Sequence, residues 1–251
     1  MKRLAGHVAL VTGAAGDIGR AIAMRFVAEG ARVVCTDIDL DGAQRTADAV
    51  SLNGAAIALQ CDVSDPASAQ ASVEATESTC GRLDVLINNA AAFCEFLPVD
   101  QLDEKQWRRE LDVNLTGAFL MSKFAIPAMV RAGGGSIIHV ASQMGHVGAP
   151  GRAAYGVTKA GLIHLARVMA IDHGPQKIRV NSLSPGAVLT NRVIRRYGSA
   201  DAVRAQLEPL YPLRRIATPG EVAAAAAFLA SEDASFVTGT DLLVDGGYTA
   251  H

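Results

Sequence analysis

Short runs of apolar residues alternate along the chain with longer stretches in which apolar residues recur at helical spacing. Val8–Val11 is the first run, and a helical pattern follows it from Ile18 to Ala28. Strands that alternate with helices of ten or more residues are typical of a parallel sheet with helices on both faces. We therefore expect one α/β domain over residues 1–251, with a doubly wound sheet of about seven parallel strands. The pattern predicts the other strands at Arg32–Thr36, Ala56–Gln60, Leu83–Ile87, Ser136–Ala141, Ile178–Leu183 and Leu242–Val244, and the other helices at Gln44–Val50, Pro66–Cys80, Asp103–Arg131, Arg152–Asp172 and Pro219–Ala230.

Composition narrows the class of protein. The chain has 251 residues, half of them hydrophobic, which is enough for one domain with a large core. Basic and acidic residues are interspersed and give a formal net charge of −2, so there is no nucleic-acid footprint. The longest apolar helical stretch, Val222–Ala230, is too short to cross a bilayer, and the apolar run after Lys2 and Arg3 is too short for a secretory signal. We expect a cytoplasmic protein with neither a membrane nor a nucleic-acid partner.

The spacing of cysteine and histidine gives no sign of a metal site. The six histidines form no H-E-x-x-H pattern, and the cysteines form no C-x-x-C pair. Free thiols in a reducing compartment and no bound metal are therefore expected. The four cysteines are Cys35, Cys61, Cys80 and Cys94.

A glycine-rich turn joins the first predicted strand to the first predicted helix. It reads Thr12-Gly13-Ala14-Ala15-Gly16-Asp17-Ile18-Gly19. Backbone N–H groups of such a turn, at the positive end of a helix dipole, bind the pyrophosphate of a dinucleotide. A turn that only packs a helix on a strand has a similar composition, but its place in the first strand–helix unit favours dinucleotide binding by a Rossmann-type fold.

Asp37 bears on the choice of dinucleotide, because it follows the second predicted strand. A carboxylate there accepts hydrogen bonds from the adenosine ribose and repels a 2′-phosphate. An ordinary turn acid is the alternative, since Asp39 and Asp41 follow closely. Neither the glycine-rich turn nor the sequence beside Asp37 carries a basic residue, so NAD is favoured over NADP.

Tyr155 and Lys159 are one helical turn apart and share a helix face. A phenol titrates near ~10 in model peptides, and a neighbouring ammonium lowers that pKa toward the range useful for proton transfer. Ser142 follows a buried strand, and the carboxyl ends of parallel strands are where ligands bind. Tyrosine and lysine at this spacing also occur by chance in many helices, so the assignment depends on the rest of the chain.

With these features in this order, the chain resembles the short-chain dehydrogenase/reductase family, in its group of about this length. The resemblance covers essentially the whole chain, and several motifs in the right order are more specific than any one of them. The motifs are the Thr12-Gly13 turn, Cys61-Asp62-Val63, Asn88-Asn89-Ala90, Asn114, Ser142 with Tyr155 and Lys159, Pro185-Gly186 with Thr190, Thr238-Gly239, and Asp245-Gly246-Gly247.

The resemblance implies an NAD-dependent oxidoreductase that interconverts a secondary alcohol and a ketone. Tyr155 would exchange a proton with the substrate oxygen, and Ser142 would hydrogen-bond the same oxygen as charge develops on it. Lys159 would hold the nicotinamide ribose and lower the pKa of Tyr155, and Asn114 would position a water that extends the proton path. The expected cofactor contacts are Gly13, Asp17, Ile18 and Gly19 at the pyrophosphate, Asp37 at the ribose, Asp62 and Val63 at the adenine, Asn89 and Ala90 at the adjoining ribose region, Tyr155 and Lys159, and Pro185, Gly186, Val188 and Thr190 at the nicotinamide.

Two positions depart from the family pattern. Asp17 stands where the family has the middle glycine of the turn. A carboxylate beside a pyrophosphate is repulsive unless it points away, whereas as a cap of the first helix it would be favourable to the dipole. Ala91 stands where a glycine usually follows Asn88-Asn89-Ala90, which is expected to narrow the cleft.

Substrate contacts are expected from Ser142, Gln143, Arg152 and Tyr155, with residues 187–215 as a substrate-binding lid. Arg152 precedes Tyr155 by one turn and either aims its guanidinium at a substrate carboxylate or lies solvated at a helix start. Gln143 is expected to hydrogen-bond a hydroxyl-bearing substrate. The segment around Ser142 and Tyr155 looks like members that handle sugar-derived acids, such as 2-keto-3-deoxy sugar acid dehydrogenases.

Two other functions compete with this one. A 3-oxoacyl-thioester reductase would use NADPH, and Asp37 counts against it. A non-catalytic NAD-binding redox sensor would have no need of both Tyr155 and Lys159. The family is usually tetrameric, so a homotetramer is expected, with the predicted Asp103–Arg131 and Arg152–Asp172 helices paired across one interface.

Overall fold

The computed structural model describes residues 2–51, 55–93 and 95–250, and its described strands form one sheet. The sheet has seven strands, all parallel, in the order β3-β2-β1-β4-β5-β6-β7. The order reverses between β1 and β4, which creates a crevice at the carboxyl ends of these strands. The predicted doubly wound α/β fold is thus confirmed. The strands are β1 (Val8–Thr12), β2 (Arg32–Asp37), β3 (Ala56–Gln60), β4 (Val85–Asn88), β5 (Gly135–Val140), β6 (Ile178–Pro185) and β7 (Asp241–Val244).

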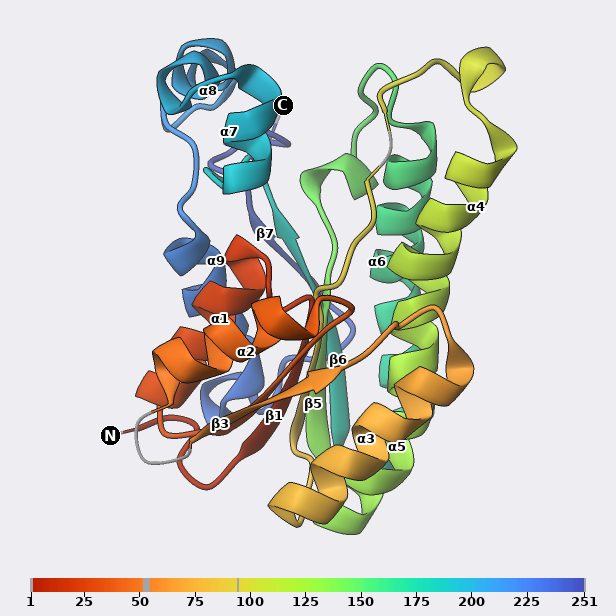
Figure 1. The fold of residues 1–251 in the computed structure, drawn as a ribbon, viewed down its shortest axis with the longest axis vertical. Helices are drawn as coiled ribbons and strands as arrows, with labels where there is room; N and C mark the ends of the chain where they lie inside the picture. Colours follow the sequence, from red (N-terminus) through yellow and green to blue (C-terminus); the bar gives the residue numbers. More distant parts are fainter. Residues whose placement is uncertain (1, 52–54, 94, 251) are drawn as a thin grey trace.

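Helices cover both faces of the sheet (Figure 1). Successive side chains of a strand point to opposite faces, so a strand covered on both sides is expected to be mostly apolar. In β1, Ala9 and Val11 join one core while Leu10 joins the other. One face carries α1 (Asp17–Ala28), α2 (Leu40–Val50) and α9 (Pro219–Ala230), and the other carries α3 (Pro66–Cys80), α4 (Glu104–Leu111), α5 (Gly117–Ala132) and α6 (Ala153–His173).

The single helix predicted over Asp103–Arg131 is interrupted in the structure. It divides into α4 and α5, joined by a wide π-helical turn at Asp112–Thr116. Such a turn loosens the regular ladder of backbone hydrogen bonds, and π turns are frequent at functional sites. Asn114, the predicted proton relay, lies within it and is buried.

Residues 187–215 form a small helical lobe above the carboxyl ends of the strands (Figure 1). The lobe contains α7 (Asn191–Tyr197), α8 (Ala200–Leu207) and a 3₁₀ turn at Glu208–Leu210. It has its own core around Val203, Tyr211 and Ile216. The C-terminal end of the chain runs beside it, and the rings of Tyr211 and Tyr248 lie 5.2 Å apart.

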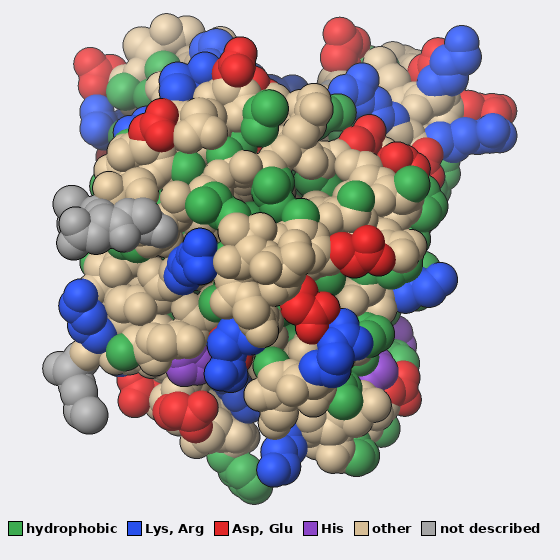
Figure 2. Space-filling view, turned by 60° about the horizontal axis from the view of Figure 1, so that its bottom comes forward, with side chains coloured by type: hydrophobic (Ala, Val, Ile, Leu, Met, Phe, Trp, Pro, Cys, Tyr) green, Lys and Arg blue, Asp and Glu red, His purple; other side chains and the backbone are tan. Residues whose placement is uncertain are grey.

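The surface in Figure 2 carries basic and acidic side chains interspersed with one another. The helical stretch Glu104–Ala132 is long and apolar enough to cross a membrane by length and composition, but half of its apolar window is buried, as in the core helix of a globular domain. Within the described ranges, no group of three or more His, Cys, Asp or Glu side chains could hold a metal ion. Cys35, Cys61 and Cys80 are free thiols, while Cys94 lies outside the described residues.

Candidate active site

The glycine-rich turn between β1 and α1 packs so closely that two of its glycines leave no room for a side chain. A Cβ on Gly13, whose φ is +66°, would lie 2.8 Å from Ala90 Cα, and a Cβ on Gly19 would collide with the Gly13 carbonyl. The Asn89 amide donates to the Thr12 and Gly13 carbonyls at 2.9 and 3.1 Å. The backbone at the amino end of α1 is therefore not covered by side chains of these glycines, so a pyrophosphate can approach its N–H groups closely. This geometry fits a dinucleotide.

Ile18 and Ala90, both predicted to contact the dinucleotide, lie beside this turn, and those contacts stay predictions. Ile18 packs its side chain against the core beneath α1. The Ala90 backbone N–H donates to the Thr12 hydroxyl at 3.0 Å, and so does that of Asn89 at 2.9 Å. Thr12 therefore joins the ends of β1 and β4 across the crevice, a role that the sequence analysis did not assign to its side chain.

Asp17 does not cap α1 with its side chain, which corrects the expectation from the sequence. The N-cap position belongs to Gly16, and Asp17 is the first helical residue. Its two carboxylate oxygens instead accept hydrogen bonds from the backbone N–H and the side-chain amide of Asn191, at 2.7 and 2.8 Å. Asn191 is the first residue of α7, so these two hydrogen bonds connect the helical lobe to the glycine-rich turn.

Asp37 lies at the carboxyl end of β2, beside the same turn. Its carboxylate accepts hydrogen bonds from the backbone N–H groups of Ala15 and Asp39, at 3.0 and 3.1 Å. The neighbouring Asp39 has a different role, because it caps α2 through the Gly42 N–H. Asp37 thus connects the end of β2 to the glycine-rich turn. An adenosine ribose would lie at this place in this fold.

Ser142, Tyr155 and Lys159 converge at the carboxyl end of β5. Ser142 lies two residues after the end of that strand and begins a short 3₁₀ turn by accepting a hydrogen bond from the Met144 N–H at 3.2 Å. Tyr155 lies in the first turn of α6 and makes a hydrogen bond with the Ser142 side chain. Lys159 follows one turn later, with its ammonium 5.6 Å from the Tyr155 ring centroid and donating to the Val140 carbonyl at 2.6 Å.

Burial governs the protonation of both titratable groups in this trio. It raises the pKa of Tyr155, and the hydrogen bond with Ser142 and the charges of Arg152 and Arg192 oppose it. It lowers the pKa of Lys159 to about 7. The expectation that Lys159 depresses the pKa of Tyr155 is therefore not met in this state, in which the ammonium is occupied by the Val140 carbonyl and the phenol stays protonated at neutral pH.

Asn114 is held against the loop that follows β4. Its side-chain oxygen accepts the Ala92 N–H at 2.7 Å, and its amide donates to the Ala92 carbonyl at 3.2 Å and to the Thr158 hydroxyl at 3.4 Å. Thr158 precedes Lys159 on α6. The π turn thus brings Asn114 next to the lysine's helix, and its role in a proton path stays a prediction.

The residues predicted at the adenine lie at the end of β3. Asp62 accepts hydrogen bonds from the backbone and hydroxyl of Ser64, at 2.9 and 2.6 Å. Val63 is buried in the core, where it lies against Gly117 at the start of α5. Their contacts with an adenine stay predictions.

The residues predicted at the nicotinamide connect β6 to the helical lobe. Pro185 ends β6, and the Gly186 N–H donates to the Val244 carbonyl at 3.0 Å. Val188 is buried and bridges to Ala217, and Thr190 caps α7 through the Val193 N–H at 3.3 Å. The segment is therefore held firmly at both ends, with its backbone along the crevice.

Gln143 is turned into the protein rather than toward a substrate. It is buried, and its side-chain oxygen accepts a hydrogen bond from the Tyr211 hydroxyl at 3.2 Å. The same hydroxyl accepts the Ala187 N–H at 2.7 Å. Tyr211 thus ties the residue after Ser142 to the residue after Gly186. Nothing in the sequence distinguishes Tyr211, because only the folded lobe brings it to these partners.

Arg152 packs against aromatic rings of the site rather than lying solvated at the helix start, and its contact with a substrate carboxylate stays a prediction. Its guanidinium carbon lies 5.4 Å from the Tyr155 ring centroid and 3.2 Å from that of Phe96. Two arginines of α7 approach the same region, Arg192 at 3.8 Å from the Phe93 centroid and Arg196 at 3.1 Å from the Phe96 centroid. No pattern in the sequence indicates that these α7 arginines lie at the site.

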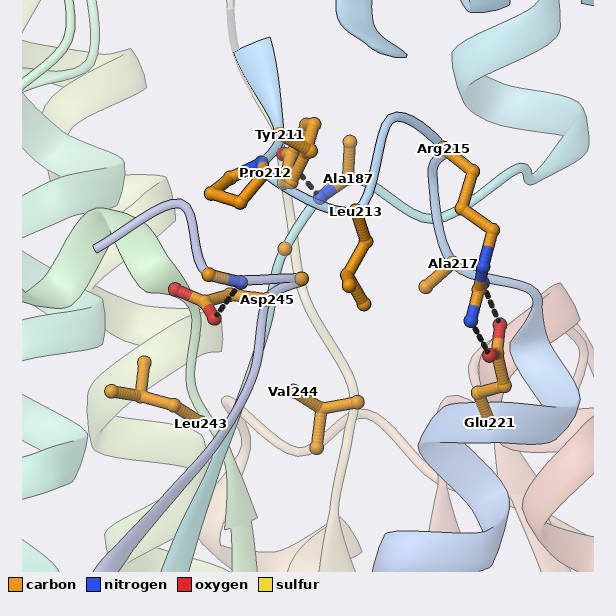
Figure 3. Close-up of a pocket in the computed structure, with 13 residues that line it drawn as sticks. Ala187, Tyr211, Pro212, Leu213, Arg215, Ala217, Glu221, Leu243, Val244 and Asp245 are labelled. Carbon is orange, nitrogen blue, oxygen red and sulfur yellow. Dashed lines mark hydrogen bonds and ion pairs between the residues drawn. The ribbon is translucent and has the colours of Figure 1, made fainter. Parts of the chain in front are cut away.

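A surface cavity of about 380 Å³ lies beside Tyr211, which forms part of its wall (Figure 3). Its walls include Leu213, Leu243 and the ion pair between Arg215 and Glu221, whose atoms approach to 2.7 Å. None of Ser142, Tyr155 and Lys159 lines it. This cavity is therefore separate from Ser142, Tyr155 and Lys159, although Tyr211, which lines it, is hydrogen-bonded to Gln143 beside Ser142.

Known proteins resemble this chain over almost its whole length. The family model described as enoyl-(acyl carrier protein) reductase matches residues 13–249. D-threitol dehydrogenase of Mycolicibacterium smegmatis is 41% identical, over 98% of this chain and 94% of its own. Cis-4-hydroxycyclohexanecarboxylate dehydrogenase of Sinomonas cyclohexanicum is also 41% identical, over 98% of each chain. A crystal structure of a short-chain type dehydrogenase/reductase from Mycobacterium marinum is 34% identical, with a TM-score of 0.93 over 100% of this chain and 98% of its own.

Proposed function

Because the chain belongs to the short-chain dehydrogenase/reductase family, we propose that it is an NAD-dependent dehydrogenase that interconverts a secondary alcohol and a ketone on a polar, sugar-derived or hydroxy-acid substrate. Family membership itself makes the chain an oxidoreductase that uses a nicotinamide dinucleotide. The observation that carries the proposal is the convergence of Ser142, Tyr155 and Lys159 at the carboxyl end of β5, with Tyr155 and Lys159 one turn apart on α6. A redox sensor without catalysis would not need this arrangement.

The residues at the end of β5 supply proton transfer and charge stabilisation. A bound dinucleotide supplies or accepts the hydride. Tyr155, protonated at neutral pH, donates its proton to the oxygen of a ketone, and its phenolate accepts one from an alcohol. Ser142 donates a hydrogen bond to the same oxygen and stabilises the negative charge that develops there. Lys159 would hold the nicotinamide ribose, and Asn114 would connect the lysine to solvent through a water.

The preference for NAD rests on Asp37. Replacing Asp37 with alanine is expected to lower the ratio of kcat/KM with NAD to kcat/KM with NADP by about tenfold or more, because a charge-assisted hydrogen bond to the ribose is lost and repulsion of a 2′-phosphate ends. Steady-state kinetics with both cofactors measures the ratio. Asp37→Asn keeps an oxygen for the Ala15 N–H and separates charge from loop geometry. An unchanged ratio in Asp37→Ala, equal to that of the exposed control Asp41→Ala, would reject the role.

The substrate class is supported by the position of Arg152 beside Tyr155. A guanidinium at this place suits a carboxylate on the carbon chain that carries the hydroxyl. Two relatives are named for polar alcohols, a sugar alcohol and a hydroxy acid. These observations together support a sugar-derived hydroxy acid, with 2-keto-3-deoxy sugar acids as the named candidates.

A homotetramer in the cytoplasm completes the proposal. Exposed apolar side chains lie on α5 and α6, the two helices expected at an interface, and they include Phe119, Val157 and Ile171 at 47, 50 and 78% exposure. Burial of these faces against a second copy would remove apolar surface from water. Light scattering that returned the mass of one chain would contradict the assembly.

The free thiols of Cys35, Cys61 and Cys80 suit a reducing compartment such as the proposed cytoplasm.

A further inference from the structure

His146 and Asp241 join two distant parts of the chain and lie outside the Ser142, Tyr155 and Lys159 set. The imidazole Nε2 of His146 is 2.7 Å from a carboxylate oxygen of Asp241, which is 95 residues away along the chain. Asp241 begins β7, the last strand of the sheet (Figure 1). Its side chain is only 5% exposed, whereas that of His146 is 29% exposed. The pair thus consists of a buried acid and a half-buried imidazole.

Two hydroxyl groups of β6 hold Asp241 in place beside His146. Ser182 and Ser184 donate to its other carboxylate oxygen, at 2.5 and 2.8 Å. An ionised carboxylate only accepts hydrogen bonds, so the imidazole of His146 donates to it from Nε2. Loss of one of these donors leaves a buried charge less well satisfied, which is unfavourable. The buried acid is therefore a fixed point on the sheet, to which His146 is attached.

His146 stands at the end of the short turn that begins at Ser142. Ser142 precedes the 3₁₀ turn Gln143–Gly145, and His146 follows it. The Gly145 N–H donates to the Ser142 carbonyl at 2.8 Å, and the His146 N–H donates to the Gln143 carbonyl at 3.0 Å. Because these hydrogen bonds join both ends of the segment into one turn, a displacement of His146 is passed on to Ser142.

The same turn packs against α6, the helix that carries Tyr155 and Lys159. A Cβ on Gly145 would lie 2.9 Å from the backbone carbonyl carbon of Lys159, so the turn touches the helix directly. The turn is thus held by α6 and, through His146, by the acid on β7. Loss of the attachment to β7 would allow the turn to shift along α6 and to carry Ser142 away from Tyr155.

We propose that His146 and Asp241 are positioning residues, which hold the Ser142 hydroxyl where it can donate to the substrate oxygen. Both act through Ser142, because the turn that His146 ends begins there. A shift of about 1 Å in a catalytic group, caused by a change elsewhere, can cost up to about 10²-fold in rate. The inference rests on the proposed function in one respect, the role of Ser142 as that donor.

A double-mutant cycle with Ser142 separates positioning from a purely structural role. His146→Leu removes the donor and is expected to lower kcat and kcat/KM for the alcohol about tenfold in the wild type. In Ser142→Ala, where no hydroxyl is left to position, the same change should cost less than about twofold. NAD affinity by isothermal titration should change less than about twofold in either background. NAD reduction is followed with D-threitol and cis-4-hydroxycyclohexanecarboxylate, the alcohols for which two relatives are named.

His173→Leu is the matched control, because it also removes a histidine hydrogen bond, the one with Gln176 at 2.8 Å, at the far end of α6. Its kcat should stay within about twofold of the wild type. His146→Gln keeps an N–H donor, so its kcat should lie closer to the wild type than that of His146→Leu. Hydrogen exchange gives a readout without turnover. The Gly145 N–H should exchange at least about tenfold faster in His146→Leu than in His173→Leu.

The outcomes separate this positioning role from the proposed function. Equal losses from His146→Leu with and without the Ser142 hydroxyl would overturn the positioning role, because His146 would then act independently of Ser142. A lower melting temperature in His146→Leu with unchanged kcat would also overturn it and assign the contact to stability alone. Absence of turnover by the wild type with either alcohol would count against the proposed function. In that case unchanged exchange at Gly145 would still overturn the positioning role, and faster exchange would support it.

Discussion

Replacing Tyr155 with phenylalanine is expected to reduce kcat by about 10²–10⁴-fold, the usual contribution of a positioned proton donor or acceptor. The ring fills the same space, and only the hydroxyl that bonds to Ser142 is lost. NAD affinity should therefore stay within about twofold of the wild type by fluorescence titration, because the residual enzyme keeps its cofactor contacts. Retained turnover would remove Tyr155 from the proton transfer.

The pH profile provides an internal control for this variant. Burial raises the pKa of Tyr155 above its ordinary value near 10, so the phenolate that accepts a proton from an alcohol becomes populated only as pH rises. In the wild type, kcat/KM for alcohol oxidation should rise steadily between pH 7 and 10, whereas ketone reduction should decline only above pH 10, where the phenol begins to lose its proton. The residual activity of Tyr155→Phe should lack this dependence. A wild-type profile that is flat over the same range would contradict the assignment.

Adding one methyl group at Gly19 is expected to weaken dinucleotide binding by up to about a hundredfold. A Cβ there collides with the Gly13 carbonyl and lies 2.9 Å from Ala14 Cα, and both are backbone atoms that cannot move aside like the end of a side chain. Overpacking of this kind typically costs about 1–3 kcal/mol. The cost falls on the turn that must cradle the pyrophosphate, and isothermal titration with NAD measures it.

Gly16 offers the matched control within the same turn. A Cβ on Gly16 would meet only the Gly13 carbonyl at 3.5 Å, an ordinary contact. Gly16→Ala should therefore bind NAD nearly as well as the wild type. Equal affinities of Gly16→Ala and Gly19→Ala would show that close packing at Gly19 does not shape the site. Circular dichroism of both variants confirms that any loss reflects binding rather than unfolding.

The order of the elements could be predicted from the sequence, because their periodicity is a local property. A run such as Val8–Val11 is apolar throughout since β1 is covered on both faces, and this pattern is visible without the fold. The glycine-rich turn and the spacing of Tyr155 and Lys159 are likewise local, because each lies within one turn or one helix. The π-helical turn at Asn114 was not predicted, because the sequence shows only a polar residue within a long helix and not the widening of one turn.

The protonation of the site depends on tertiary structure. The spacing of Tyr155 and Lys159 predicts a lowered pKa of the phenol, yet burial of the phenol dominates and Lys159 donates its hydrogen bond to the Val140 carbonyl. Burial is decided by everything packed around a group, and this information is spread over the whole chain. A local spacing rule therefore identifies the groups that are close together, but it does not give the free energy of charging them.

The parallel sheet can be predicted from the sequence, and so can the glycine-rich turn and the grouping of Ser142, Tyr155 and Lys159, because each follows from residue types at short spacing. The partners of Asp17, Gln143 and the α7 arginines emerge only when the chain is folded. Asp17 meets Asn191, Gln143 meets Tyr211, and Arg196 meets Phe96 across the crevice. These pairs are far apart in the chain, and the path of the lobe over the strand ends, which no periodicity encodes, brings them together.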